Sequence, residues 1–141
     1  MAETAEYLKL THEGALAALN AGMAKAKAME QPQCISVVDN GGHLLAFVRM
    51  DGAFHMSQET SLRKARTAAC YADPTGGLAE GIDMKLAIGT DGQRINLFGG
   101  LPIIVNGHCI GGVGVGSGTG EQDREVAAAA IAAIPGSLSF D

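Results

Sequence analysis

The sequence has no tryptophan, and aromatic residues of any kind make up only 4% of it. Proteins that hold single-stranded nucleic acid stack the bases on aromatic side chains, so this scarcity argues against a nucleic-acid partner. Basic residues are scarce too, since 10 lysines and arginines face 15 acidic residues, for a net charge of −5. A chain with that charge has no general attraction to nucleic acid or to an anionic membrane surface.

Cysteine is also scarce, and the sequence contains three: Cys34, Cys70 and Cys109. Their wide spacing contains no C-x-x-C motif, which predicts no zinc site and no dithiol redox motif. The sequence also lacks a run of about 20 apolar residues and the apolar stretch of a secretory leader. These absences predict a cytoplasmic protein with reduced thiols and no membrane partner.

Alanine and glycine, in contrast, are abundant, with 20 glycines in 141 residues. The length fits a single domain over residues 1–141, and a hydrophobic content of 47% is enough to build a core. Small side chains make that core thin. We therefore expect the protein to bury a further face against another copy of itself, as a homo-oligomer.

Apolar residues at helical spacing alternate along the chain with short β-branched runs. The predicted helices span residues 12–30, 57–72, 77–87 and 119–135. Their N-cap candidates are Thr11, Ser57 and Thr119, the last in a capping box with Gln122. The predicted strands span residues 33–39, 43–49, 93–98, 102–106 and 108–115. Tight turns join neighbouring strands, so the sequence predicts an α+β fold with a mostly antiparallel sheet of about five strands and helices packed against it.

Glycines crowd residues 99–120, and Gly114–Gly118 opens onto the last predicted helix. Free N–H groups at a helix start bind anions, which makes this loop a candidate carboxylate or phosphate site. The alternative is that the glycines thin a strand so that a helix or another subunit can pack on it. No Lys-Ser/Thr pair follows and no βαβ unit surrounds the loop, so the sequence predicts no nucleotide site.

Charged and imidazole side chains supply further candidates. Arg49, at the end of a predicted strand, can grip a carboxylate with its planar guanidinium, or it can form a plain ion pair with Asp51. His12 lies in the first turn of a helix, where the dipole disfavours imidazolium and leaves a ring nitrogen free for a metal. For each histidine taken alone, however, the sequence favours an ordinary surface or capping residue. The basic cluster of Arg63, Lys64 and Arg66 is typical of a solvated helix face.

Three segments together resemble one family: VVDNGGHLLAFVRMDGA (37–53), LRKARTA (62–68) and GGLPIIVNGHCIGGVGVGSGTGEQD (99–123). The chain resembles the GlcG/HbpS-type haem-binding proteins, a domain that is also the C-terminal domain of PduO-type corrinoid adenosyltransferases. The resemblance implies a compact α+β fold that assembles into dimers or larger rings. It also implies a pocket near the Arg-Met-Asp turn and the glycine-rich hairpin, shared between subunits.

The resemblance leads to two functional hypotheses. The first is a protein that binds haem or another anionic planar ligand, with Arg49 on a propionate and His12 or His55 as the iron ligand. Its predicted ligand-binding residues are Arg49, Met50, Asp51, Gly99, Gly100, Gly116 and Ser117. The alternative is a small catabolic enzyme (a lyase, isomerase or hydrolase) acting on an organic acid or heterocycle. In that enzyme Arg49 holds the carboxylate and His55, Asp51 or Glu121 moves a proton.

Overall fold

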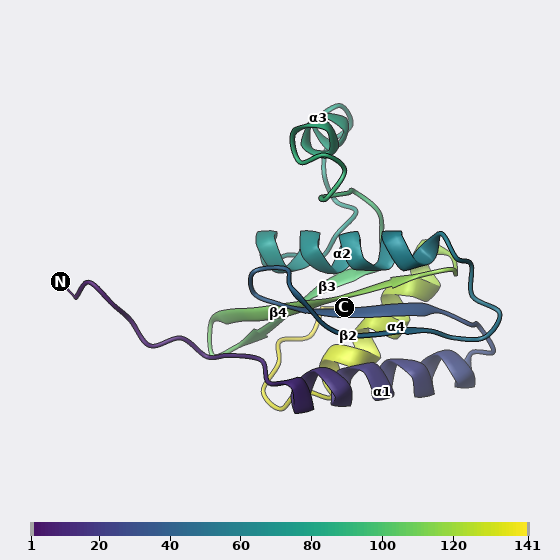
Figure 1. Cartoon of the computed structure of the whole chain (residues 1–141), viewed down its shortest axis with the longest axis horizontal. Helices are drawn as coiled ribbons and strands as arrows, with labels where there is room; N and C mark the ends of the chain where they lie inside the picture. Colours follow the sequence, from purple (N-terminus) through teal and green to yellow (C-terminus); the bar gives the residue numbers. More distant parts are fainter. Residues whose placement is uncertain (1, 141) are drawn as a thin grey trace.

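A computed structural model describes residues 2–140 and shows one antiparallel sheet with helices on both faces (Figure 1). The strands lie in the order β2-β1-β4-β3, and every neighbouring pair is antiparallel. Their bounds are β1 Cys34–Asp39, β2 Leu44–Arg49, β3 Gly100–Val105 and β4 His108–Gly116. The predicted α+β class is therefore confirmed, with four strands in the sheet.

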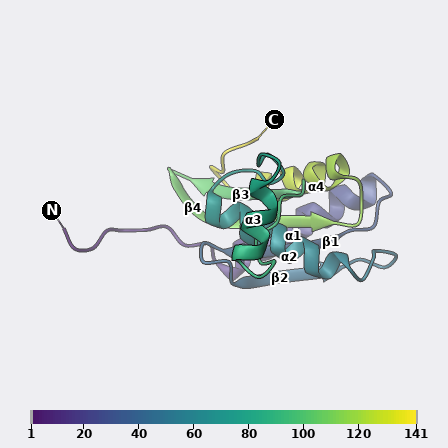
Figure 2. The same cartoon turned by 90° about the horizontal axis from the view of Figure 1, so that it is seen from above.

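Three helices cover the sheet and a fourth does not. Helix α2 (Ser57–Tyr71) lies along one face, while α1 (His12–Ala28) and α4 (Gly120–Ala132) lie on the other (Figure 1). The short helix α3 (Ile82–Gly89) stands away from the body, beyond α2 (Figures 1 and 2). No helix among residues 2–140 combines the length and apolar character that crossing a membrane requires.

The main core fills the space between the sheet and the α1–α4 pair. Alternate strand residues such as Ile35, Val37, Val113 and Val115 point into it and are fully buried. The helices meet them with small side chains, which lets the backbones approach closely. The buried alanines on these two helices are Ala15, Ala18, Ala26, Ala127 and Ala130.

On the opposite face of the sheet, glycines of β4 lie against α2. Gly112, Gly114 and Gly116 alternate along β4, and a Cβ at each would run into α2 or its side chains. At Gly114 the added atom would overlap the Ser61 carbonyl oxygen and the Ala65 nitrogen, both of them backbone atoms of α2. The packing interpretation of the glycine-rich segment therefore holds for these three residues, because their missing side chains let α2 rest on the strand.

Two of the three predicted caps are confirmed. The Thr11 side chain accepts a hydrogen bond from Gly14 N, and Thr119 forms the full capping box with Gln122. The prediction for Ser57 is wrong, because Ser57 is the first residue of α2 and its side chain caps nothing. It is buried instead, beside the space that a side chain at Gly116 would need.

The predicted strand over residues 93–98 is also wrong. Its backbone is held by side chains rather than by a neighbouring strand: the Ile95 N–H donates to Thr67 Oγ1 on α2, at 3.0 Å. Asn96 pairs with the backbone of Leu78 in both directions. Residues 93–98 therefore form a loop that contacts α2. The helix predicted over 77–87 forms later in the sequence, as α3.

A charged side chain stabilises the turn between β1 and β2. Asp39 accepts hydrogen bonds from Gly41 N at 2.9 Å and from His43 N and Nδ1 at 3.0 Å each. Burial alone would raise the pKa of the Asp39 carboxyl, but these hydrogen bonds and the nearby His43 outweigh it and lower the pKa. The ionised carboxylate therefore favours the folded hairpin.

This lowered pKa sets the sign of a pH dependence. A depressed folded-state pKa adds stability that is present above the unfolded value, about 3.9, and is lost as the pH falls through the folded value. We expect Asp39→Asn to be less stable than the parent by about 1 kcal/mol at pH 7. Urea unfolding at pH 7 and at pH 3 should show this difference shrink in acid. An equal difference at both pH values would show that the charge is irrelevant.

Candidate functional site

The predicted ligand-binding residues gather at one end of the sheet, where β1 begins and β2 and β4 end. In the sheet register Cys34 lies opposite Arg49 on one side and Gly116 on the other. The β3 side of the same end is closed by a hydrogen bond from Val115 N to Gly99 O, at 2.9 Å. We call this region, comprising Cys34, Arg49, the loop 50–56, and residues 116 and 117, the Arg49 end.

The loop 50–56 is fixed to the sheet through Ser117. The Phe54 N–H donates to Ser117 Oγ at 3.0 Å, and Gln31 Nε2 donates to the Ser117 carbonyl oxygen at 3.3 Å. Ser117 has a positive φ of 106°, a conformation that is uncommon for a residue with a side chain. The predicted ligand residue Ser117 thus holds the loop in place, with its hydroxyl facing the loop backbone.

Arg49 itself is exposed at the end of β2, and no hydrogen bond or ion pair engages its guanidinium within residues 2–140. Asp51 is exposed as well and forms no ion pair in the same part of the chain. The alternative of an Arg49–Asp51 ion pair is therefore not realised. The Arg49 guanidinium, which has no partner among the described residues, is therefore available to an external anion at this end of the sheet.

The thiol of Cys34 lies beneath this end. It is fully buried, and its Sγ is 3.6 Å from the carbonyl oxygen of Phe54. Burial raises the pKa of the Cys34 thiol, against smaller opposing effects of the Ser117 hydrogen bond and the positive charge of Arg49. Cys34 is therefore a neutral packing residue, although it is adjacent to the arginine.

The loop surface around Arg49 is apolar. Phe54 is 66% exposed and Met56 72% exposed, although side chains of this kind are usually sheltered. His55 lies between them and is exposed too. The other predicted residue on this loop, Met50, is half-buried and packs against the main core. The exposed side chains of the loop are thus the apolar Phe54 and Met56, the imidazole of His55 and the carboxylate of Asp51, next to a guanidinium that has no partner among residues 2–140.

The glycines predicted to bind ligand are tightly enclosed by protein. A Cβ at Gly99 would lie 2.6 Å from Val115 O and 3.0 Å from Lys64 Nζ, and Gly100 faces Thr75 and the Lys64 backbone. Gly116 faces Ser57 and Thr60 of α2. A side chain at any of these three glycines would meet α2, Thr75, Asp123 or the end of β4, so their lack of a side chain permits close packing at this end of the sheet.

Under that end lies a buried ion pair that the sequence analysis missed. Lys64 Nζ on α2 is 3.0 Å from Asp123 Oδ2 on α4, and it also donates to Val115 O at 2.8 Å. Asp123 Oδ1 accepts from Gly118 N at 2.9 Å. Both charged side chains are less than 7% exposed, so the interpretation of Lys64 as part of a solvated face is wrong. Helical spacing could have indicated the burial of Lys64, because Lys64 lies on the same buried face of α2 as Ser61 and Ala68.

The remaining candidates are dispersed. Glu121 is exposed in the first turn of α4, and no side-chain hydrogen bond joins it to His55 or Asp51 within residues 2–140. His12 is the first residue of α1, exposed, with Nε2 3.9 Å from Glu13 Oε1. Helix α1 is about 25 Å long and its other end leads toward β1. Of the two proposed iron ligands, His55 therefore shares the Arg49 end and His12 does not.

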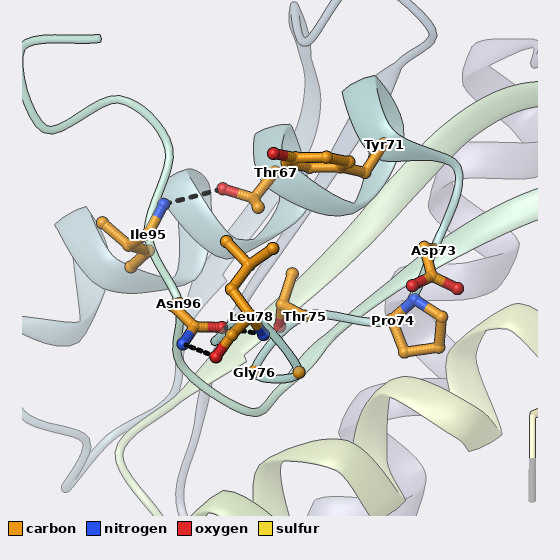
Figure 3. Close-up of a pocket in the computed structure, with 10 residues that line it drawn as sticks. Thr67, Tyr71, Asp73, Pro74, Thr75, Gly76, Leu78, Ile95 and Asn96 are labelled. Atoms are coloured by element: carbon orange, nitrogen blue, oxygen red, sulfur yellow. Dashed lines mark hydrogen bonds between the residues drawn. The ribbon is translucent and has the colours of Figure 1, made fainter. Parts of the chain in front are cut away.

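A small cavity of about 70 Å³ lies elsewhere, between the C-terminal part of α2 and the loops that lead to α3 and back (Figure 3). Tyr71 and Leu78 face each other across it, and the Asn96–Leu78 hydrogen bonds close its base (Figure 3). It has room for only a few water-sized groups, so it does not fit a large planar ligand.

A four-stranded antiparallel sheet with a glycine-lined strand under one helix and two helices behind it defines a class of small α+β proteins. The family model described as "Haem degrading protein HbpS-like" matches residues 10–132 of this chain. The chain belongs to that HbpS-like family, which confirms the resemblance inferred from the three sequence segments.

Individual relatives agree with this assignment. Protein GlcG of Escherichia coli K12 is 40% identical over 107 residues, which cover 75% of this chain and 80% of GlcG. The crystal structure of Klebsiella pneumoniae protein ORFY superposes with a TM-score of 0.88 at 33% identity, covering 94% of this chain and 95% of ORFY. A structure described as a PduOC–haem complex superposes with a TM-score of 0.85 at 27% identity, covering 95% of this chain and all of that one.

Proposed function

We propose that this protein binds haem or another planar ligand with carboxylates at the Arg49 end. The observation that carries the proposal is the exposed Arg49 guanidinium, which has no partner among residues 2–140, followed directly by a loop with the exposed apolar side chains of Phe54 and Met56. A tetrapyrrole has an apolar face and anionic edges, and this surface offers both complements. The related PduOC domain, whose structure is described as a haem complex, supports the choice of ligand.

In this proposal Arg49 holds a propionate through two parallel N–H···O bonds, a geometry that a planar guanidinium provides. Because the whole chain is net negative, an acid can bind only where a local positive charge offsets the overall repulsion. Phe54 and Met56 contribute the apolar contact. The chemistry at such a site would be that of the haem iron, and His55 is the histidine of this end that would hold it.

The test is a haem titration followed by the Soret band. Arg49→Ala is expected to weaken binding by about 2 kcal/mol or more, roughly thirty-fold, because a paired charge is lost from a surface that the ligand dehydrates. Arg49→Lys should recover only part of the loss, since lysine keeps the charge but lacks the fork. Lys9→Ala, which removes an exposed charge from the N-terminal segment, is the control and should bind as the parent does.

Two further variants assign the iron ligand in the same titration. His55→Ala should alter the position of the Soret band, while His12→Ala should leave it unchanged if one protomer holds the whole ligand. Should both Arg49 variants bind haem as tightly as the parent while remaining folded, the Arg49 end is not the site.

A further inference from the structure

Ser117 has a backbone conformation that suits glycine, although glycines stand on both sides of it. Its φ is 106°, whereas the other non-glycine residues with positive φ among residues 2–140 lie between 49° and 56°. Those lower values belong to the small left-handed region that side chains can enter, and 106° lies beyond it. Neither Gly116 nor Gly118 has a φ in the left-handed range. The strained position of this segment is therefore occupied by the serine.

The Ser117 hydroxyl anchors a residue that is distant in the sequence. Its Oγ accepts the Phe54 N–H at 3.0 Å. The Phe54 carbonyl oxygen lies 3.6 Å from the Sγ of the buried Cys34, at the start of β1. Phe54 is thereby tied on one side to the end of β4 and on the other to the start of β1.

The rest of the loop has only local hydrogen bonds. Within residues 2–140, the other backbone hydrogen bonds of residues 51–56 join groups three or four positions apart, such as Ala53 N to Met50 O and Ser57 N to Phe54 O. Local bonds shape a turn, but they do not fix where the turn lies against the sheet. The placement of the exposed loop side chains therefore depends on the anchor at Phe54.

We infer that Ser117 is a positioning residue of the Arg49 end: its strained backbone is retained because its hydroxyl holds the loop 50–56 in one arrangement before a ligand binds. Strained residues persist at functional sites where their neighbours fix them. Here Gln31 Nε2 holds the Ser117 carbonyl oxygen at 3.3 Å, and Asp123 Oδ1 holds the next N–H, of Gly118, at 2.9 Å. A loop that is ordered in advance loses less entropy on binding, so Ser117 raises affinity without touching the ligand. This last step rests on the proposed function.

The first experiment is amide hydrogen exchange without haem. Ser117→Gly and Ser117→Ala both remove the hydroxyl, and each should speed exchange of the Phe54 amide by at least about tenfold. The Gly41 amide, which donates to Asp39 at the other end of β1, should exchange as in the parent. Unchanged exchange at Phe54 in both variants overturns the inference.

Thermal unfolding separates the backbone of Ser117 from its hydroxyl. Glycine accepts a φ of 106° without strain and alanine does not, so Ser117→Gly should melt at a higher temperature than Ser117→Ala. The reverse order would show that the position is not strained and would contradict the inference. Asn106→Gly is the matched control, at an exposed positive-φ position in the turn between β3 and β4. It should leave Phe54 exchange and haem binding unchanged.

The haem titration measures whether binding follows the hydroxyl or the stability. Ser117→Gly and Ser117→Ala should both bind roughly tenfold more weakly than the parent, despite their different melting temperatures. Ser117→Thr keeps a hydroxyl at the strained position, so it should bind more tightly than Ser117→Gly although it melts lower. An affinity that follows the melting temperature, or one that is unchanged when the loop is released, overturns the inference. A parent that binds no haem would contradict the proposed function alone, since exchange decides the positioning of the loop without haem.

Discussion

Gly114→Ala is expected to destabilise the fold by more than about 4 kcal/mol, or to prevent folding. The added Cβ would overlap the backbone oxygen of Ser61 and the backbone nitrogen of Ala65, so no side-chain rotation can relieve the clash. Helix α2 would have to lift off β4, and it would lose packing along its whole buried stripe. Thermal or urea unfolding of the purified variant measures the effect.

The matched control is Gly77→Ala. A Cβ at Gly77 would meet no atom within 4 Å, and its backbone is not in the left-handed region. Alanine there restricts the unfolded chain and should leave stability unchanged or raise it by about 0.4–1 kcal/mol. If Gly114→Ala unfolds at the same denaturant concentration as Gly77→Ala, α2 does not rest on β4 as described.

Asp123→Ala is expected to cost about 3–5 kcal/mol of folding free energy. Among residues 2–140, the substitution leaves the buried Lys64 ammonium with the Val115 carbonyl as its one remaining hydrogen-bond partner, and a buried charge without a counter-charge is strongly destabilising. It also removes the acceptor that fixes Gly118 before α4. Urea unfolding at pH 7 should show the loss directly.

Two comparisons separate the buried pair from surface charge effects. The double variant Lys64→Met with Asp123→Leu removes both charges and should recover much of the stability, since apolar residues can replace a buried ion pair. Glu125→Ala breaks the exposed contact of α4 with Lys25, at 3.6 Å, and should cost at most about 1 kcal/mol. An Asp123→Ala variant no less stable than Glu125→Ala would contradict the structural role of the pair.

The sequence alone determined the features that depend on neighbours along the chain. The Asn40-Gly41-Gly42 turn determined that β1 and β2 pair in antiparallel orientation, because so short a connection cannot join two parallel strands. Thr11 and Thr119 cap their helices because a hydroxyl reaches an N–H only three residues away. The apolar periodicity and the family-specific segments were likewise sufficient for the α+β class and for the HbpS-like family.

Only the tertiary structure decided what depends on distant partners. Residues 93–98 have strand-like composition, but their backbone bonds to the side chains of Thr67 on α2 and Thr90 after α3, with no neighbouring strand, so they form a loop. Lys64 appeared solvated in a basic run, yet Asp123, 59 residues away, makes its burial tolerable. The glycines of β4 could have faced a ligand or a helix, and the position of α2 assigned them to the helix. Whether a side chain is buried and which polar group it pairs with depend on which helices and strands pack together. The local spacing of residues along the chain does not specify that packing.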